Sequence, residues 1–243
     1  MKRLLITQSN YIPWKGYFDA INSVDEFIIY DDVQYTKNDW RNRNKIKTPQ
    51  GTQWLTIPVD VSGKMGQKIN EAKVSEKQLN WRWVHWRALT YNYSKAPYFK
   101  DYREPFEKHY LVENQEMNLS KINYSFIVLI NEILGIKTPM KWSSEYALIG
   151  GRNERLVDLC KQARATDYYS GPAAKSYIQT ELFDKEGIKV HFFDYSSYPE
   201  YHQLYGAFEH AVSILDLIFN EGPNARNFIK SFTNLPMLEP SNA

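Results

Sequence analysis

The sequence predicts an α/β fold with a doubly wound, mostly parallel, Rossmann-like sheet that carries a helical insertion or cap. A strand–turn–helix–strand pattern occupies about the first 30 residues, and a similar alternation returns after about residue 165. Helical periodicity dominates the stretch between them. We expect a single α/β domain over residues 1–235, with the helical insert at about 76–135 and a C-terminal tail at 236–243.

The first unit is the clearest. Residues 4–6 form an apolar run that predicts a buried strand, and residues 27–30 form a second one. Between them, a helix over about residues 13–23 begins at Pro13, whose missing N–H costs nothing in a first turn. Strand, helix and strand in this order predict a βαβ unit with a right-handed crossover.

The next segment is irregular. Residues 37–47 are too polar and too rich in Asn for a packed element. A strand is expected over residues 54–59, a surface loop over 62–67 and a further short strand within 68–74.

Apolar periodicity predicts the remaining elements. Helices are expected over 81–93, 105–112 and 119–134, the last stopped by Gly135. The elements that follow are a strand at 140–143, a helix over 153–165, a strand that ends at 168–171, a helix over 172–183, a strand at 189–193 and a helix over 211–220.

Composition excludes several classes of protein. The 30 Lys and Arg nearly balance the 28 Asp and Glu, so nucleic acid is an unlikely partner for the whole chain. The single cysteine, Cys160, excludes an intramolecular disulfide framework and a cysteine-rich zinc site, and the histidines are not at metal-ligand spacing. We therefore assign no metal-ligating residues.

The chain has no apolar run near the roughly 20 residues that a membrane span needs, and its first residues do not fit a signal peptide. We expect a cytoplasmic protein without a membrane span; a homo-oligomer is compatible with the sequence. The chain is 15% aromatic, with 18 Tyr and 7 Trp. Such side chains suit pockets for sugars and nucleotides, or an irregular core.

Polar residues follow three of the predicted strands. They are Gln8 to Asn10, the pair Asp31 and Asp32, and Ser170 with Gly171. Ligands of parallel sheets bind at the carboxyl ends of the strands, so these turns predict a site. The alternative for Asn10 and Ser170 is helix capping. The Asp pair suits a divalent cation such as Mg²⁺, a catalytic base, a partner for sugar hydroxyls, or an acidic turn without function.

The segment 37–47 is basic. Its cations are Lys37, Arg41, Arg43, Lys45 and Lys47. Arginine binds phosphate through two parallel hydrogen bonds, and Asn42 and Asn44 suit sugars or amides. The segment therefore suits a nucleotide diphosphate or another anionic carrier. A solvated basic loop is the alternative.

Several sequence blocks occur in the order typical of one family. The first reads Gln8-x-Asn10-Tyr11-Ile12-Pro13-Trp14-x-Gly16, and the others lie at residues 30–37, 41–47, 54–59, 169–174 and 213–220. The chain resembles the WbqC-like family over about residues 3–222. It departs from the family pattern at Thr7, where that pattern has His, and at Ser9, where it has Pro.

The resemblance implies a role in bacterial O-antigen and related surface polysaccharide biosynthesis. It further implies transfer of glycine, or a similar acyl group, to an amino sugar. It supplies no established catalytic residues to transfer to this chain.

The sequence and the resemblance together lead to an expected N-acyl or aminoacyl transferase. Its substrate is an amino sugar on a nucleotide or lipid diphosphate, and its donor an acyl-CoA, an acyl carrier or an aminoacyl compound. The expected catalytic residues are Asp31 or Asp32 as base, with backbone N–H groups near Asn10 or Ser170 for the oxyanion. The expected substrate-binding residues are Gln8, Tyr11, Trp14, Tyr35, Lys37, Arg41, Asn42, Arg43, Ser170 and Gly171.

Two other functions remain open on the sequence alone. One is a non-catalytic accessory protein that binds a sugar or nucleotide within a glycan assembly complex. The other is a nucleotide-using transferase that depends on Mg²⁺, suggested by the βαβ start and the paired aspartates.

Overall fold

Five parallel strands form the central sheet of the computed structural model, which describes residues 1–113, 115–233 and 237–238. The strand order is β5–β2–β1–β6–β7, and every pairing is parallel. Leu5 of β1 pairs with Phe27 of β2 on one side and Tyr169 of β6 on the other. The strands are β1 (Arg3–Thr7), β2 (Glu26–Ile29), β5 (Met140–Trp142), β6 (Asp167–Ser170) and β7 (Lys189–Phe192).

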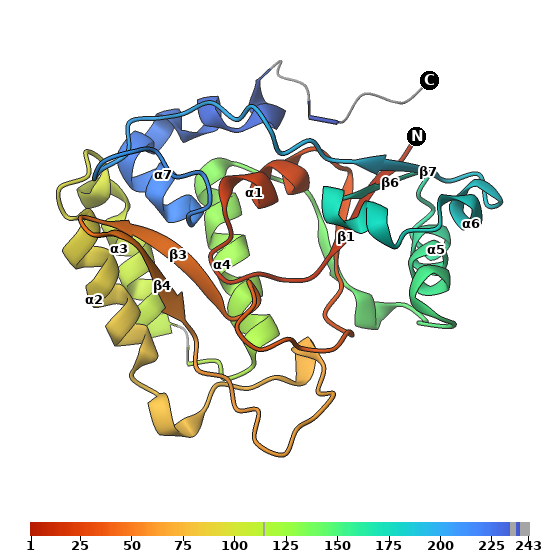
Figure 1. Cartoon of the computed structure of the whole chain (residues 1–243), viewed down its shortest axis with the longest axis horizontal. Coiled ribbons are helices and arrows are strands. Elements are labelled where there is room, and N and C mark those ends of the chain that lie inside the picture. Colours follow the sequence, from red (N-terminus) through yellow and green to blue (C-terminus); the bar gives the residue numbers. More distant parts are fainter. Residues whose placement is uncertain (114, 234–236, 239–243) are drawn as a thin grey trace.

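Helices cover both faces of this sheet (Figure 1). Because side chains alternate along a strand, Leu5 packs into the core that contains α1, α4 and α7, whereas Leu4 and Ile6 pack against α5 and α6. The helices are α1 (Lys15–Asn22), α4 (Leu119–Leu134), α5 (Arg152–Gln162), α6 (Thr180–Asp184) and α7 (Ile214–Glu221). The predicted α/β, doubly wound class is confirmed.

The part of the segment between β2 and β5 that precedes α4 forms a second body of structure beside the sheet, with its hairpin and helices at the left of Figure 1. It contains the antiparallel pair β3 (Arg43–Thr48) and β4 (Gly51–Thr56), then α2 (Trp81–Tyr93) and α3 (Phe99–Lys108), which a π-helix at His109–Glu113 extends. The insertion into the sheet therefore begins before residue 76 and includes a hairpin as well as helices.

One prediction in this segment is wrong. Part of the polar stretch 37–47 is a packed strand, β3, in which Asn44 and Lys47 are buried. Asn44 Nδ2 donates a hydrogen bond to the carbonyl of Ile12 at 2.9 Å, and Lys47 Nζ donates one to Gln203 Oε1 at 2.7 Å. Polar side chains with such partners are tolerated inside a protein, so composition alone misled the assignment.

Three other boundaries differ from the prediction. Residues 68–74 hold a 3₁₀ helix at Ile69–Glu71 and only isolated β-bridges, and the predicted helix 172–183 is a 3₁₀ turn at Pro172–Ser176 followed by α6. α3 begins well before residue 105, because Phe99 and Phe106, seven residues apart on one helix face, are both buried.

The 16-residue helix α4 closely matches its prediction. Asn118 caps its start by accepting a hydrogen bond from the N–H of Lys121, and Gly135 ends it in the left-handed conformation at φ 66°. Among the helices formed by residues 1–113, 115–233 and 237–238, none has the length and apolar character needed to cross a membrane.

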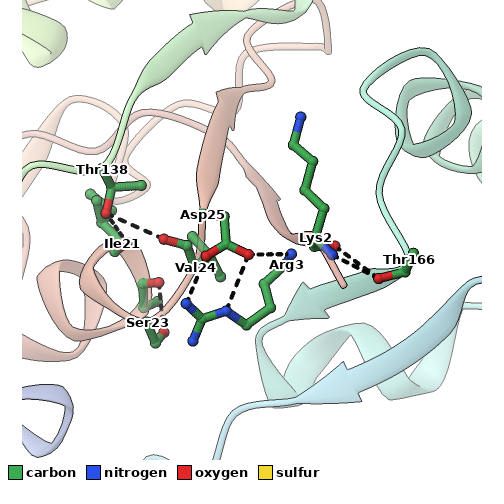
Figure 2. Close-up of polar contacts among 9 residues, drawn as sticks. Lys2, Arg3, Ile21, Ser23, Val24, Asp25, Thr138 and Thr166 are labelled. Atoms are coloured by element: carbon green, nitrogen blue, oxygen red, sulfur yellow. Dashed lines mark hydrogen bonds and ion pairs between the residues drawn. The ribbon is translucent and has the colours of Figure 1, made fainter.

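The amino ends of the strands are held together by polar contacts (Figure 2). The N–H of Lys2 donates to Thr166 Oγ1 at 2.8 Å, which joins β1 to β6. Arg3 donates to the two carboxylate oxygens of Asp25 through its backbone N–H at 2.8 Å and Nη2 at 2.7 Å, which joins β1 to β2. Thr138, before β5, bonds to the end of α1. The loops that form the site lie at the opposite, carboxyl ends of these strands.

The predicted tail at 236–243 lies largely outside the described residues. Within it, Met237 and Leu238 are described and pack against the core. The N–H of Asp194 donates to the carbonyl of Met237 at 2.9 Å, and Leu238 forms a β-bridge with Phe193.

Candidate functional site

A cleft of about 950 Å³ lies at the carboxyl ends of β1, β2 and β6. Thr7 and Gln8 line it after β1, Asp32 after β2, and Ser170 and Gly171 after β6. The strands β1 and β6 are neighbours, but the chain leaves them toward opposite faces of the sheet, to α1 and to α6. This switch point is where open α/β sheets bind their ligands.

The start of α5 forms a second wall of the cleft. Gly150 and Gly151 precede the helix, and Arg152 and Arg155 lie in its first turn. The Arg152 guanidinium stacks on the ring of Tyr177 at 3.5 Å from the ring centroid, and Arg155 Nε donates to the carbonyl of Gly150 at 2.9 Å. The unpaired N–H groups of a helix start and the positive dipole end favour an anion here.

Arg41 joins the basic segment to the turn after β1. Its Nη1 donates to Asn10 Oδ1, and its Nη2 donates to Gln8 Oε1 at 3.1 Å. The side chain lines the cleft with 18% of its surface exposed. Gln8, Asn10 and Arg41, predicted as site residues from two separate segments, therefore lie together.

The cleft is strongly positive. Its lining residues include four cations and one carboxylate, Asp32. The cations are Arg41, Lys68, Arg152 and Arg155. A cleft with this excess of one charge concentrates ligands of the opposite charge, and arginine side chains grip phosphate or carboxylate with two hydrogen bonds.

Asp32 is oriented by its neighbours. Asn70 Nδ2 donates to its Oδ1 at 2.9 Å, Ser143 Oγ donates to its Oδ2 at 2.5 Å, and Lys68 Nζ lies 4.0 Å from Oδ1. The Asp32 side chain keeps 12% of its surface exposed. Since an ionised carboxylate has about four acceptor positions, Asp32 retains capacity for a ligand.

Asp31 lies in the interior, contrary to our expectation that it could act as a base. It is 1% exposed, and it accepts hydrogen bonds from the N–H of Ser9 at 2.8 Å, from Ser9 Oγ at 2.7 Å and from Ser120 Oγ. Burial raises the pKa of Asp31, although these hydrogen bonds lower it in part. Consecutive residues at a strand end point to opposite sides, so only Asp32 reaches the cleft.

Three predicted sugar-contacting residues are also buried away from the cleft. The Tyr11 hydroxyl bonds to His85 Nδ1 at 2.9 Å and to the Tyr110 hydroxyl at 2.6 Å. Asn42 donates to a backbone carbonyl, and Tyr35 is 7% exposed. Tyr11 and Asn42 therefore hydrogen-bond within the protein, and none of the three residues lines the cleft.

Lys37, Arg41 and Arg43 are the cations among the expected substrate-binding residues, and the structure brings only Arg41 of these to the cleft. The Arg43 guanidinium stacks on Trp54 at 4.0 Å from the ring centroid, and Lys37 is exposed. Neither lines the cleft. Arg43 lies in β3, whose pairing with β4 directs its side chain to the Trp54 ring. Trp14 does not line the cleft either; it lines a smaller, separate pocket.

The comparisons place this chain in a family. A sequence model described as the WbqC-like protein family matches residues 8–228, which is most of the chain. The chain belongs to the WbqC-like protein family. It is 52% identical over 230 residues to "Uncharacterized protein Rv1507c" of Mycobacterium tuberculosis (strain ATCC 25618 / H37Rv), an alignment that covers 95% of this chain and 98% of that protein. No solved structure matches the chain.

In this WbqC-like protein, the sequence analysis missed several lining residues of the cleft. Lys68, Arg152 and Arg155 come from segments far from the three predicted strand ends, and Tyr177 lies in the segment that follows Ser170 and Gly171. A signal was present for two of them, because Gly150-Gly151 precedes the helix predicted over 153–165, and two arginines three residues apart lie at the start of this helix. Lys68 and Tyr177 carry no such signal.

Groups suited to metal or thiol chemistry are scarce in this WbqC-like protein. In the part of the chain that the structure describes, no three His, Cys, Asp or Glu side chains are grouped to hold a metal ion. Cys160 lies on the buried face of α5, and burial raises the pKa of its thiol. A buried thiol of this kind behaves as a small apolar side chain.

Proposed function

We propose that this protein transfers an acyl or aminoacyl group, such as glycine, to the amino group of a sugar carried on a nucleotide or lipid diphosphate. The observation that carries the proposal is the pairing of four cations with a single oriented carboxylate, Asp32, in one cleft. A diphosphate-linked amino sugar has the complementary charges, two phosphates and an ammonium group. The acyl chemistry and the link to surface polysaccharide assembly rest on membership in the WbqC-like family.

The diphosphate would lie at the start of α5. Arg152 and Arg155 flank the N–H groups of this helix start, and Lys68 and Arg41 face them from other segments. Charge-assisted hydrogen bonds of this kind contribute about 1.5–3 kcal/mol each. Asn10 acts as a positioning residue, because its side-chain oxygen accepts a hydrogen bond from Arg41.

The amino group would lie at Asp32. As the amine nitrogen bonds to the carbonyl carbon of an activated acyl group, the bond from that carbon to its leaving group breaks. Because the bound group starts as an ammonium, the nitrogen releases two protons: Asp32 accepts the first before the attack, and the second departs with the leaving group. Ser143 and Asn70 keep the carboxylate aimed during this transfer, since each holds one of its oxygens.

Calorimetric titration with UDP-glucosamine tests the binding step. Arg152→Ala should weaken binding at least about tenfold, the loss of one charge-assisted hydrogen bond. Arg87→Ala is the matched control, because Arg87 also stacks on an aromatic ring, that of Trp83 at 4.5 Å, but lies on α2 away from the cleft. Equal affinities for both variants would contradict a diphosphate site at α5.

Asp32→Asn tests the chemical step. The variant should lose the preference of the wild type for UDP-glucosamine over UDP-N-acetylglucosamine, because the acetylated sugar has no ammonium for Asp32 to bind. With glycyl or acetyl thioester donors, turnover should fall about 100-fold, the usual scale for a general base. Binding of UDP-glucosamine without turnover of any donor would exclude transfer and favour a binding protein.

A further inference from the structure

We propose that a second pocket beside the cleft binds the apolar acyl group of the donor, a role that rests on the proposed transfer reaction. This aromatic pocket has a volume of about 260 Å³. Its lining residues include Asn10, Trp14, Asn44, Tyr195, His210 and Ala211. It does not share a lining residue with the cleft, yet the two are adjacent.

Two contacts join the aromatic pocket to the cleft. Asn10 lines the pocket and accepts a hydrogen bond from Arg41, which lines the cleft. Tyr195 lines the pocket, and its hydroxyl lies 3.6 Å from the position of a Cβ on Gly171, at the cleft wall. A donor in the pocket and an acceptor in the cleft would therefore meet across Asn10 and Gly171.

The walls of the pocket favour an apolar group. The rings of Trp14 and Tyr195 meet edge to face with centroids 5.1 Å apart. The amide of Asn44 is already used, because its Nδ2 donates to the carbonyls of Tyr11 at 3.2 Å and Ile12 at 2.9 Å. Sugar hydroxyls or base edges would need free polar partners, which this amide does not offer.

The rim of the pocket carries no charge at neutral pH. Burial and the nearby Lys15 ammonium lower the pKa of His210, so its imidazole is neutral. Lys15 itself donates from Nζ to the carbonyl of Pro199 at 2.7 Å and is enclosed by aromatic rings. An uncharged aromatic rim suits a thioester better than a phosphate.

The turn that forms the pocket is strained. Ile12 has φ 36°, which is rare for a β-branched residue, and its carbonyl is held by Asn44. Gly16 is also required, since a Cβ there would lie 2.3 Å from the Trp14 ring. Backbone strain of this kind is concentrated at ligand sites, and here it lies between Asn10 and Trp14.

Asn10 supplies a polar group suited to the acyl carbonyl. Its Oδ1 is bonded to Arg41, and its Nδ2 has no hydrogen-bond partner among the residues that the structure describes. An amide N–H donor beside apolar walls matches an acyl group, which has one carbonyl oxygen and an alkyl chain.

Acyl thioesters of N-acetylcysteamine test this assignment without a nucleotide. Acetyl, butyryl and hexanoyl compounds are titrated calorimetrically into the full chain. Affinity should rise about fourfold for each methylene that enters the pocket. A flat dependence on chain length, or no measurable binding of the hexanoyl compound, would overturn the proposal.

Ala211→Phe places a ring in the pocket and should weaken hexanoyl binding at least tenfold, while UDP-glucosamine binding stays within about threefold of the wild type. Ala207→Phe is the control, because Ala207 is exposed on the same loop and lines neither pocket. Unchanged hexanoyl binding in Ala211→Phe would overturn the assignment. If the thioesters behave as expected but UDP-glucosamine does not bind, the proposed sugar substrate fails and the acyl site stands.

Discussion

Asp31 and Asp32, the two carboxylates that follow β2, differ in their hydrogen-bond partners and in their exposure to solvent. On the inner side, Asp31 accepts three hydrogen bonds from Ser9 and Ser120 and is 1% exposed. On the outer side, Asp32 has two hydrogen-bond partners, keeps 12% of its side-chain surface exposed and faces a cleft with an excess of cations. Two consecutive carboxylates therefore have different tasks, one in stability and one in a ligand site.

The same contrast extends to the insertion. Tyr11, His85 and Tyr110 form a closed set of buried hydrogen bonds, with no polar atom directed to a ligand. Lys68 and Arg152, by contrast, are exposed to solvent, and both line the cleft. Removing an interior polar group leaves its buried partners without a hydrogen bond, whereas removing a cleft group that reaches solvent has little structural cost.

The largest effect should come from Asp31→Ala. This change leaves three buried donors without a partner, namely the N–H and hydroxyl of Ser9 and the hydroxyl of Ser120. The free energy of unfolding should fall by at least about 3 kcal/mol. Urea denaturation at pH 7 measures it, and a loss below about 1 kcal/mol would show that Asp31 is not the structural partner described here.

The next effect is a dependence of stability on pH. Burial lowers the pKa of His85 to about 3, from 6.5 in an unfolded chain. Between these values the unfolded chain binds the extra proton, so the free energy of unfolding falls by about 1.4 kcal/mol per pH unit as the pH drops from 6.5 toward 3. His85→Gln should remove this contribution from the slope that a series of urea denaturations measures. Equal slopes in variant and wild type would contradict a neutral, buried His85.

The smallest effects on stability should come from the cleft. Asp32→Asn and Arg152→Ala should each change the free energy of unfolding by no more than about 0.5 kcal/mol, because both side chains reach solvent. The same denaturation series measures them. A loss comparable to that of Asp31→Ala would remove the distinction between the interior and the cleft.

Several elements could be predicted because the deciding interactions are local. The apolar runs at residues 4–6 and 27–30, and the capped and glycine-terminated helix α4, lie where the sequence pattern placed them. The strand β3 could not be predicted, since Asn44 and Lys47 are buried only because distant residues supply their hydrogen-bond partners. The hydrophobicity pattern of a segment contains no information about hydrogen-bond partners that lie elsewhere in the chain.

The α/β class, the family and the strand ends at Gln8, Asp32 and Ser170 follow from patterns within the sequence, and the structure places these three residues at the cleft. The sequence by itself did not determine which of two adjacent aspartates faces a ligand, nor that Arg152 and Lys68 complete the cleft. Those assignments depend on the side of the sheet toward which each side chain points at the strand end. They also depend on which distant segments of the chain fold against that end. Only the packing of the chain in three dimensions decides both.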